Sequence, residues 1–210
     1  MGQGDTNTQL MKRHYRDETK QILTQLSKLS DERSRQIAER KNLGFLTCAI
    51  VGYTNAGKST LLRLLSGADV LVEDRLFATL DTTVRKVDLG PGKTILLSDT
   101  VGFIRKLPSH LIASFKSTLS EALEADILLH VIDISHPKFL EQIAVVNDTL
   151  DQLGTQGKPI VFVFNKIDKI TNRSNIAELQ SEYSPSVFIS AERGINISAL
   201  TNKLLELLDV

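Results

Sequence analysis

The pattern of apolar and polar residues divides the chain into an N-terminal helical stretch and a longer region of mixed elements. Residues 9–41 are rich in charge, contain no Pro or Gly, and place Ile22, Leu26 and Leu29 at helical spacing. This pattern predicts one long amphipathic helix. Because Arg33 interrupts the thin apolar stripe, we expect the helix to pack against a surface that this chain supplies only in part.

From residue 46 onward, apolar runs alternate with amphipathic stretches, which is typical of a parallel sheet with crossover helices. We predict strands at 46–52, 84–90, 93–99, 127–133, 159–165 and 186–190. We predict helices at 58–66, 110–124, 137–152, 173–183 and 196–208. The turn at 89–93 (LGPGK) is too short for a crossover, so the second and third strands should form an antiparallel hairpin. We therefore expect two regions, a Gly-rich start with a helical linker at 1–45 and an α/β domain at 46–210.

A glycine-rich motif follows the first predicted strand. Residues 52–59 read GYTNAGKS, which matches G-x-x-x-x-G-K-[ST] and lies between an apolar strand and a helix, as this phosphate-binding motif requires. Backbone N–H groups and the helix N-terminus would cradle phosphates. Lys58 would reach the β- and γ-phosphates, and Ser59 would bind Mg²⁺. The predicted fold class is thus α/β, a three-layer P-loop NTPase with a mostly parallel six-stranded sheet and one antiparallel strand.

A second motif, DTVG at residues 99–102, follows the strand at 93–99. Parallel strands end at the same sheet edge, so Asp99 should lie near the glycine-rich loop, where it can hold Mg²⁺ through water. Gly102 has the backbone freedom to approach a γ-phosphate and to release it after hydrolysis.

Two further strand ends predict that the base is guanine. Asn165-Lys166-Ile167-Asp168 ends the strand at 159–165. The Asp168 carboxylate would accept hydrogen bonds from the N1–H and N2 amine of guanine, donors that adenine lacks at those positions. Ser190-Ala191-Glu192 follows the last strand and can present a backbone N–H to guanine O6.

These four motifs, in this order, resemble the translation-factor-like class of P-loop GTPases. The segment FATLDTTVR at 77–85, with GYTNAGKST, DTVGFI, NKID and the GQGDT start, is similar to the HflX family of ribosome-associated GTPases. The resemblance covers nearly the whole chain and implies that Thr79 is the switch I threonine that binds Mg²⁺ and senses the γ-phosphate. Thr82 and Thr83 are chemically equal alternatives.

The predicted site falls into three overlapping sets. The catalytic residues are Lys58, Thr79 and Gly102, and the metal ligands are Ser59, Thr79 and Asp99. The nucleotide-binding residues are Gly52, Tyr53, Thr54, Asn55, Ala56, Gly57, Lys58, Ser59, Thr60, Phe77, Ala78, Thr79, Leu80, Asp81, Asp99, Thr100, Val101, Gly102, Asn165, Lys166, Asp168, Ser190, Ala191 and Glu192.

Two residues bear on the rate of hydrolysis. Phe103 stands where Ras-like GTPases carry a glutamine that orients the attacking water, so we expect slow intrinsic turnover. Asn55 stands in the phosphate loop where some related GTPases carry an asparagine that holds a K⁺ ion, although asparagine there can equally serve loop geometry. The expected cofactor is Mg²⁺, with K⁺ as a further candidate, and GTP and GDP are the expected substrate and product.

The family resemblance also implies a partner, the large ribosomal subunit, and a role in splitting stalled ribosomes. HflX proteins carry a further N-terminal domain before the Gly-rich segment, and the sequence lacks it. We therefore expect either a truncated chain or a naturally shortened relative, monomeric, that binds ribosomes weakly. The alternatives are an RNA-modification or ribosome-assembly GTPase of the Era and TrmE kind, and a module that senses GTP without hydrolysing it.

Amino-acid composition bears on whether the chain folds, on its possible partners and on its cellular compartment. Hydrophobic residues make up 41% and charged residues 24% of the chain, which is ordinary for a folded protein. Residues 1–45 carry nine Lys and Arg against six Asp and Glu, a bias that fits either a polyanionic partner or a solvated helix face. The single cysteine, Cys48, excludes an internal disulfide and should be buried and inert. We expect a cytoplasmic protein that does not enter the membrane, because the sequence has neither a spanning apolar stretch nor a signal peptide.

Overall fold

A computed structural model describes residues 7–67, 83–90, 92–100, 120–171 and 175–208. Six strands form one sheet in the order β2-β3-β1-β4-β5-β6. Their bounds are β1 Leu46–Gly52, β2 Thr83–Gly90, β3 Lys93–Asp99, β4 Ile127–Asp133, β5 Ile160–Asn165 and β6 Ser186–Phe188. Neighbouring strands are parallel except β2, which pairs antiparallel with β3. The predicted α/β class with one antiparallel strand is confirmed.

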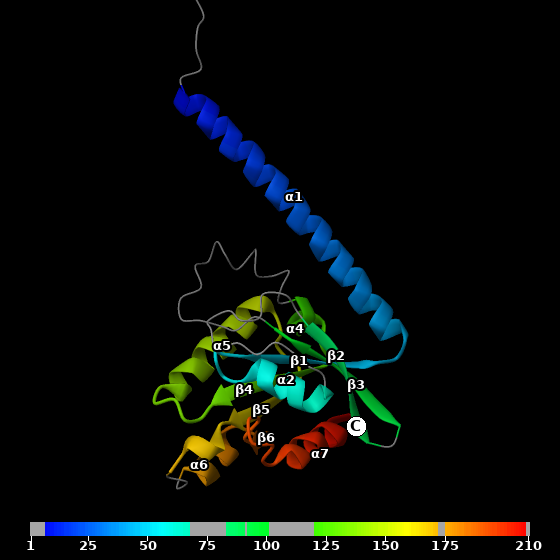
Figure 1. Ribbon diagram of the computed structural model, residues 1–210, viewed down its shortest axis with the longest axis vertical. Helices are drawn as coiled ribbons and strands as arrows, with labels where there is room; N and C mark the ends of the chain where they lie inside the picture. Colours follow the sequence, from blue (N-terminus) through cyan, green and yellow to red (C-terminus); the bar gives the residue numbers. More distant parts are fainter. Residues whose placement is uncertain (1–6, 68–82, 91, 101–119, 172–174, 209–210) are drawn as a thin grey trace, which may run out of the picture.

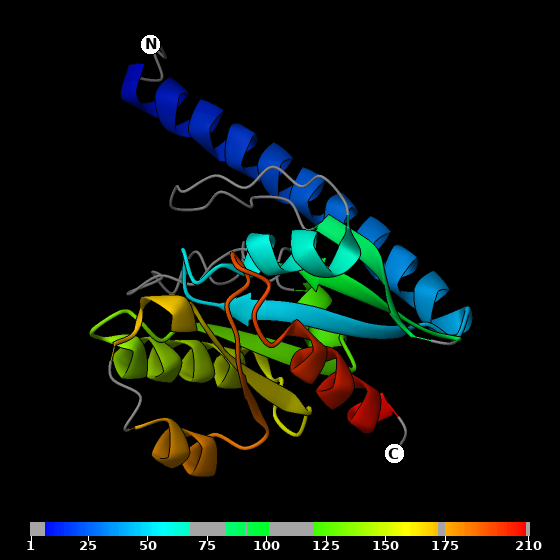
Figure 2. The ribbon, with the colours of Figure 1, turned by 60° about the horizontal axis from the view of Figure 1, so that its bottom comes forward.

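Helices cover both faces of this sheet (Figures 1 and 2). Apart from the N-terminal helix, the helical elements in the described residues are α2 Lys58–Ser66, α4 Ser120–Glu124, α5 Phe139–Leu153, the 3₁₀ turn η1 Ile167–Lys169, α6 Ile176–Glu182 and α7 Ile197–Leu208. One core cluster joins the sheet to α2 and α7, and two others join it to α4, α5 and α6. Three layers result, with the sheet in the middle.

Strand β1 shows why a central strand reads as a continuous apolar run. Cys48 and Ile50 face the α2 and α7 side, whereas Ala49 and Val51 face the α4 and α5 side. Successive side chains of a strand point to opposite faces, so all four are buried. Burial, and next the Asp126 carboxylate, raises the pKa of the Cys48 thiol, which agrees with the prediction of a buried, inert cysteine.

The N-terminal helix α1 spans Asn7–Asn42, where the sequence predicts a helix over 9–41. It leads into β1 and extends away from the sheet (Figure 1). Ile22, on the predicted apolar stripe, is 56% exposed. Within the described residues, none of the helices has the length and apolar composition that crossing a membrane requires.

The sheet topology determines where a site can form. Strands β1, β3, β4, β5 and β6 run parallel, so their carboxyl ends lie along one edge. Because β1 has β3 on one side and β4 on the other, the chain winds away from it in both directions. Ligands of open α/β sheets bind at such a point, beyond the carboxyl ends of the strands.

Candidate functional site

The loop after β1 needs glycine at both of its ends. A Cβ on Gly52, whose φ is +148°, would lie 2.2 Å from the carbonyl oxygen of Val131. A Cβ on Gly57, whose φ is +97°, would lie 2.3 Å from the side-chain nitrogen of Asn165. Since Gly57 also caps α2, the glycines of the motif let the loop pass close to β4 and β5 and turn into the helix.

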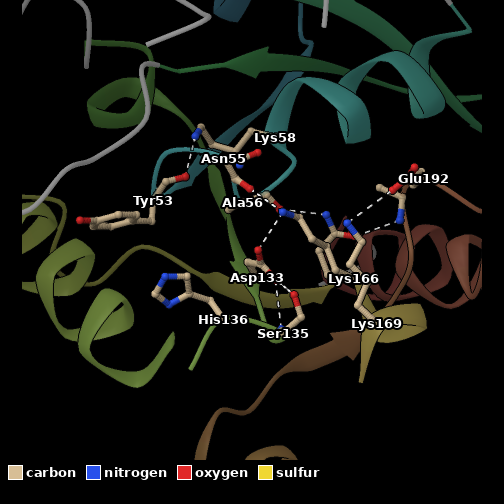
Figure 3. A network of polar contacts seen from close by, with 12 residues as sticks. Tyr53, Asn55, Ala56, Lys58, Asp133, Ser135, His136, Lys166, Lys169 and Glu192 are labelled. Atoms are coloured by element: carbon tan, nitrogen blue, oxygen red, sulfur yellow. Dashed lines mark hydrogen bonds and ion pairs between the residues drawn. The ribbon is translucent and has the colours of Figure 1, made fainter. Parts of the chain in front are cut away.

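Side-chain donors hold the carbonyl groups of this loop (Figure 3). The amide of Asn165 donates to the Ala56 carbonyl at 2.9 Å, and the ammonium of Lys166 donates to the Asn55 carbonyl at 2.8 Å. In a trans peptide the C=O and the next N–H point in opposite directions. Fixing the Ala56 carbonyl therefore turns the Gly57 N–H away from Asn165, which is the arrangement of a backbone cradle for an anion.

Lys58, the first residue of α2, brings positive charge to the cradle. Its side chain is buried, and its ammonium donates to the Tyr53 carbonyl at 3.0 Å. Burial lowers the pKa of Lys58 to about 8, against the opposing effect of the Asp99 carboxylate. An anion at the cradle would relieve this desolvation penalty, because it would pair with the ammonium.

Ser59 and Asp99 lie beside each other beneath the loop. The Ser59 hydroxyl donates to Asp99 Oδ2 at 2.6 Å, so α2 and the end of β3 bring the two predicted metal ligands together. One hydroxyl and one carboxylate fit Mg²⁺, which is usually held by one or two carboxylates together with water and phosphate oxygens. No cluster of three or more His, Cys, Asp or Glu side chains in the described residues offers a metal site made by protein alone.

Thr100, predicted to be a nucleotide-binding residue, directly follows β3 and turns its side chain into the interior. Its side chain is fully buried, and its hydroxyl donates to the Ile50 carbonyl at 2.7 Å. The structure thus uses this predicted nucleotide-binding side chain to join the end of β3 to β1. The other residues predicted around the switch loops, Phe77 to Asp81 with Val101 and Gly102, lie outside the described residues, as does Phe103.

Asn165, at the end of β5, connects the loops of the site. It is 2% exposed; its amide binds Ala56, and its side-chain oxygen accepts the Ala191 N–H at 2.9 Å. Asn165 therefore positions the glycine-rich loop against the loop after β6. The N–H groups of Ser190 and Ala191 are bonded to the Ile195 carbonyl and to Asn165, so which N–H of this segment meets guanine O6 stays a prediction.

Asp168 presents a carboxylate at the same edge. Its side chain is 7% exposed, and within the described residues Oδ1 has no hydrogen-bond partner. A hydrogen bond from Ser190, helped by Arg193 and Lys169, holds the pKa of Asp168 below its usual value. The group therefore remains an anionic acceptor at neutral pH, suited to a ligand with adjacent N–H donors.

The sequence analysis missed one charged residue of the site, Asp133 at the end of β4. Its Oδ2 lies 2.7 Å from the Lys166 ammonium, and its Oδ1 accepts hydrogen bonds from the Ser135 N–H and hydroxyl. The available signal was the one that revealed Asp99, a carboxylate directly after a buried apolar strand. No motif drew attention to Asp133.

Comparison with known proteins identifies relatives of this arrangement. Residues 47–166 match the family described as 50S ribosome-binding GTPase. GTPase HflX of Magnetococcus marinus is 43% identical over 203 residues, which are 97% of this chain and 47% of that protein. GTPase HflX of Caldanaerobacter subterraneus is 46% identical over 199 residues, 95% of this chain and 45% of that protein. The chain thus spans about half the length of these curated relatives.

Solved structures show the same fold. A GTP-binding protein from Sulfolobus solfataricus, in complex with GDP, has a TM-score of 0.66 at 30% identity and covers 95% of this chain and 61% of its own. Era, in complex with MgGDPNP and nucleotides of 16S ribosomal RNA, has a TM-score of 0.62 at 28% identity and covers 77% of this chain and 56% of its own.

Proposed function

The chain belongs to the HflX family of P-loop GTPases, and on this premise we propose that it is a magnesium-dependent GTP switch that acts on the large ribosomal subunit. Membership of the family supports the proposal that the domain hydrolyses GTP to GDP and phosphate. The metal, the roles of single residues and the ribosomal partner are further parts of the proposal.

One observation carries the proposal, the contact of Ser59 with Asp99 at 2.6 Å beneath the glycine-rich loop. These side chains would hold Mg²⁺, which would place positive charge on the β- and γ-phosphates where negative charge develops during hydrolysis. Lys58 would pair with the same phosphates from the start of α2. Thr79, in the predicted switch loop at 75–84, would complete the metal ligands when a γ-phosphate is present.

The base would lie between the loops that follow β5 and β6. Asp168 would accept the N1–H and the N2 amine of guanine, and Asn165 would keep the two loops in register. A water molecule would be the nucleophile. Phe103 has no hydrogen-bonding group to orient that water, so hydrolysis by the isolated domain should be slow and open to stimulation by a partner.

The large ribosomal subunit is proposed as that partner because the family matched by residues 47–166 is described as ribosome-binding. A switch has differential affinity for its partner in its two nucleotide states. In this proposal the predicted switch loops at 75–84 and 99–110 differ between the two nucleotide states. The protein should therefore bind large subunits more tightly with a non-hydrolysable GTP analogue than with GDP.

Co-sedimentation with purified large ribosomal subunits tests this proposal. We expect protein in the pellet with the GTP analogue and little with GDP. With small subunits as the matched control, we expect less protein in the pellet with either nucleotide. Equal pelleting with the two nucleotides, or no pelleting with either, would contradict the proposal that the nucleotide state controls ribosome binding.

A further inference from the structure

Lys166 forms one ion pair and one hydrogen bond that together join three segments of the site, the glycine-rich loop, the end of β4 and the turn after β5. Its ammonium lies 2.7 Å from Asp133 Oδ2 and 2.8 Å from the Asn55 carbonyl. The Lys166 and Asp133 side chains are only 17% and 16% exposed. Figure 3 shows the ammonium between the glycine-rich loop and the end of β4.

Neither backbone at this contact adopts an ordinary conformation. Asn55 has a φ of +61° and Lys166 a φ of +66°, both in the left-handed region, which lysine in particular rarely adopts. Such conformations persist only where neighbouring contacts hold them. The hydrogen bond from Lys166 to Asn55 connects these two left-handed residues directly, so the position of the ammonium matters for the shape of the loop.

Asp133 itself is held in one orientation. Its Oδ1 accepts the Ser135 N–H at 3.0 Å and the Ser135 hydroxyl at 2.5 Å, which leaves Oδ2 directed at Lys166. Hydrogen bonds between charged groups contribute more than neutral ones when they are partly removed from water. Asp133 is therefore arranged to keep the ammonium at the loop rather than in solvent.

From these contacts we infer that Asp133 is a positioning residue for nucleotide binding, which holds Lys166 against the Asn55 carbonyl and so links the glycine-rich loop to the base-selecting loop. This inference rests on the proposed function, because it places a nucleotide across those loops. In this proposal Asp133 acts through Lys166, with which it pairs, and not by binding the nucleotide itself. Removing its charge should weaken binding of GDP as well as GTP.

The test is a double-mutant cycle read as GDP affinity by titration calorimetry. Asp133→Asn keeps the shape of the side chain, removes its charge and should raise the Kd for GDP by about tenfold. Lys166→Met keeps the aliphatic stem and removes the ammonium. If Asp133 acts through that ammonium, the double variant should bind GDP no more weakly than Lys166→Met alone.

Two controls separate positioning from folding. Glu206→Gln removes the acidic partner of Lys203 in an exposed ion pair on α7, so it should leave the Kd unchanged. Ser135→Ala, a milder change that removes one contact with Asp133, should weaken binding in the same direction by less. Ser135→Ala therefore tests the positioning role of Asp133 even if the Asp133→Asn variant does not fold.

The outcomes are distinguishable. A Kd for Asp133→Asn within twofold of the wild-type value, or losses that multiply in the double variant, would overturn the role of Asp133 while leaving the GTPase intact. Failure of the wild-type protein to bind GDP would overturn the proposed function, and this inference with it.

Discussion

At the residue scale, burial decides the chemistry of several polar side chains. His130, in the middle of β4, is 1% exposed and packs beside Phe162, with ring centroids 5.6 Å apart. Burial, and next the Lys58 ammonium, lowers the pKa of His130 to about 3. The imidazole is therefore neutral in the folded protein at neutral and mildly acidic pH.

This histidine should make stability depend on pH. The unfolded chain binds a proton on His130 below about pH 6.5, whereas the folded chain does so only near pH 3. Protons therefore favour the unfolded state, and the stability present above pH 6.5 should fall by roughly 1 kcal/mol between about pH 7.5 and 5.5. Denaturant unfolding of wild type and His130→Gln checks it. If the variant kept the full wild-type pH dependence, another group would be responsible.

At the element scale, the turn from β1 into the glycine-rich loop has little tolerance for change. Gly52 lies against the backbone of β4, where a Cβ would meet the Val131 carbonyl at 2.2 Å. Gly67, after α2, has a φ of +63° and nothing within 4 Å of such a Cβ. The two glycines thus separate steric crowding from backbone strain.

Alanine should accordingly have unequal effects at these positions. Gly67→Ala should cost about 1 kcal/mol of unfolding free energy, from the left-handed conformation alone. Gly52→Ala should cost about 3 kcal/mol or more, since β1 and β4 must also move apart. Urea unfolding of both variants measures the difference. Equal losses would show that β4 yields easily to the added methyl group.

The elements also show what the sequence could and could not predict. The central strands at 46–52, 93–99 and 127–133 were predicted at their observed bounds, because buried parallel strands are unbroken apolar runs. The last strand, predicted to reach residue 190, ends at Phe188, where the Asn196 side chain binds the strand's last carbonyl and Ser190 pairs with Ile195. That contact comes from later in the chain, so local pattern does not reveal it.

The candidate site shows the same contrast between what local sequence predicts and what depends on distant segments. Gly52, Gly57, Lys58, Ser59 and Asp99 were predictable because their spacing is a motif. The role of Asn165 as a connector depends on Ala56 and Ala191 meeting it from distant segments. The ion pair of Asp133 with Lys166 likewise depends on β4 and β5 being neighbours. Motifs identify residues, whereas the order of strands decides which of them meet.

At the scale of the whole molecule, the parallel sheet places the carboxyl ends of β1, β3, β4, β5 and β6 at one edge, where we propose the GTPase centre. Asn55 is exposed there, and we propose its side chain as a ligand for K⁺. Because Phe103 cannot orient the attacking water, hydrolysis by the isolated chain should be slow, below the enzyme median of about 10 s⁻¹. If Asn55 binds K⁺, hydrolysis should be faster in K⁺ than in Na⁺.

Single-turnover hydrolysis in the two salts measures this, with Asn55→Ala as the variant that should lose the difference. Equal rates in K⁺ and Na⁺ would remove the proposed ion while leaving the GTPase assignment in place.

Whether Asp168 recognises a guanine base at this edge is tested by titration calorimetry of wild type and Asp168→Asn with diphosphates of different bases. Wild type should bind GDP and not ADP. Asp168→Asn should lose about a hundredfold or more of its GDP affinity, because the guanine N–H donors lose a charged acceptor. The variant should gain affinity for xanthosine diphosphate, whose C2 oxygen can accept from the new amide. Equal binding of GDP and ADP by wild type, or an Asp168→Asn variant that keeps its preference for GDP, would contradict the account.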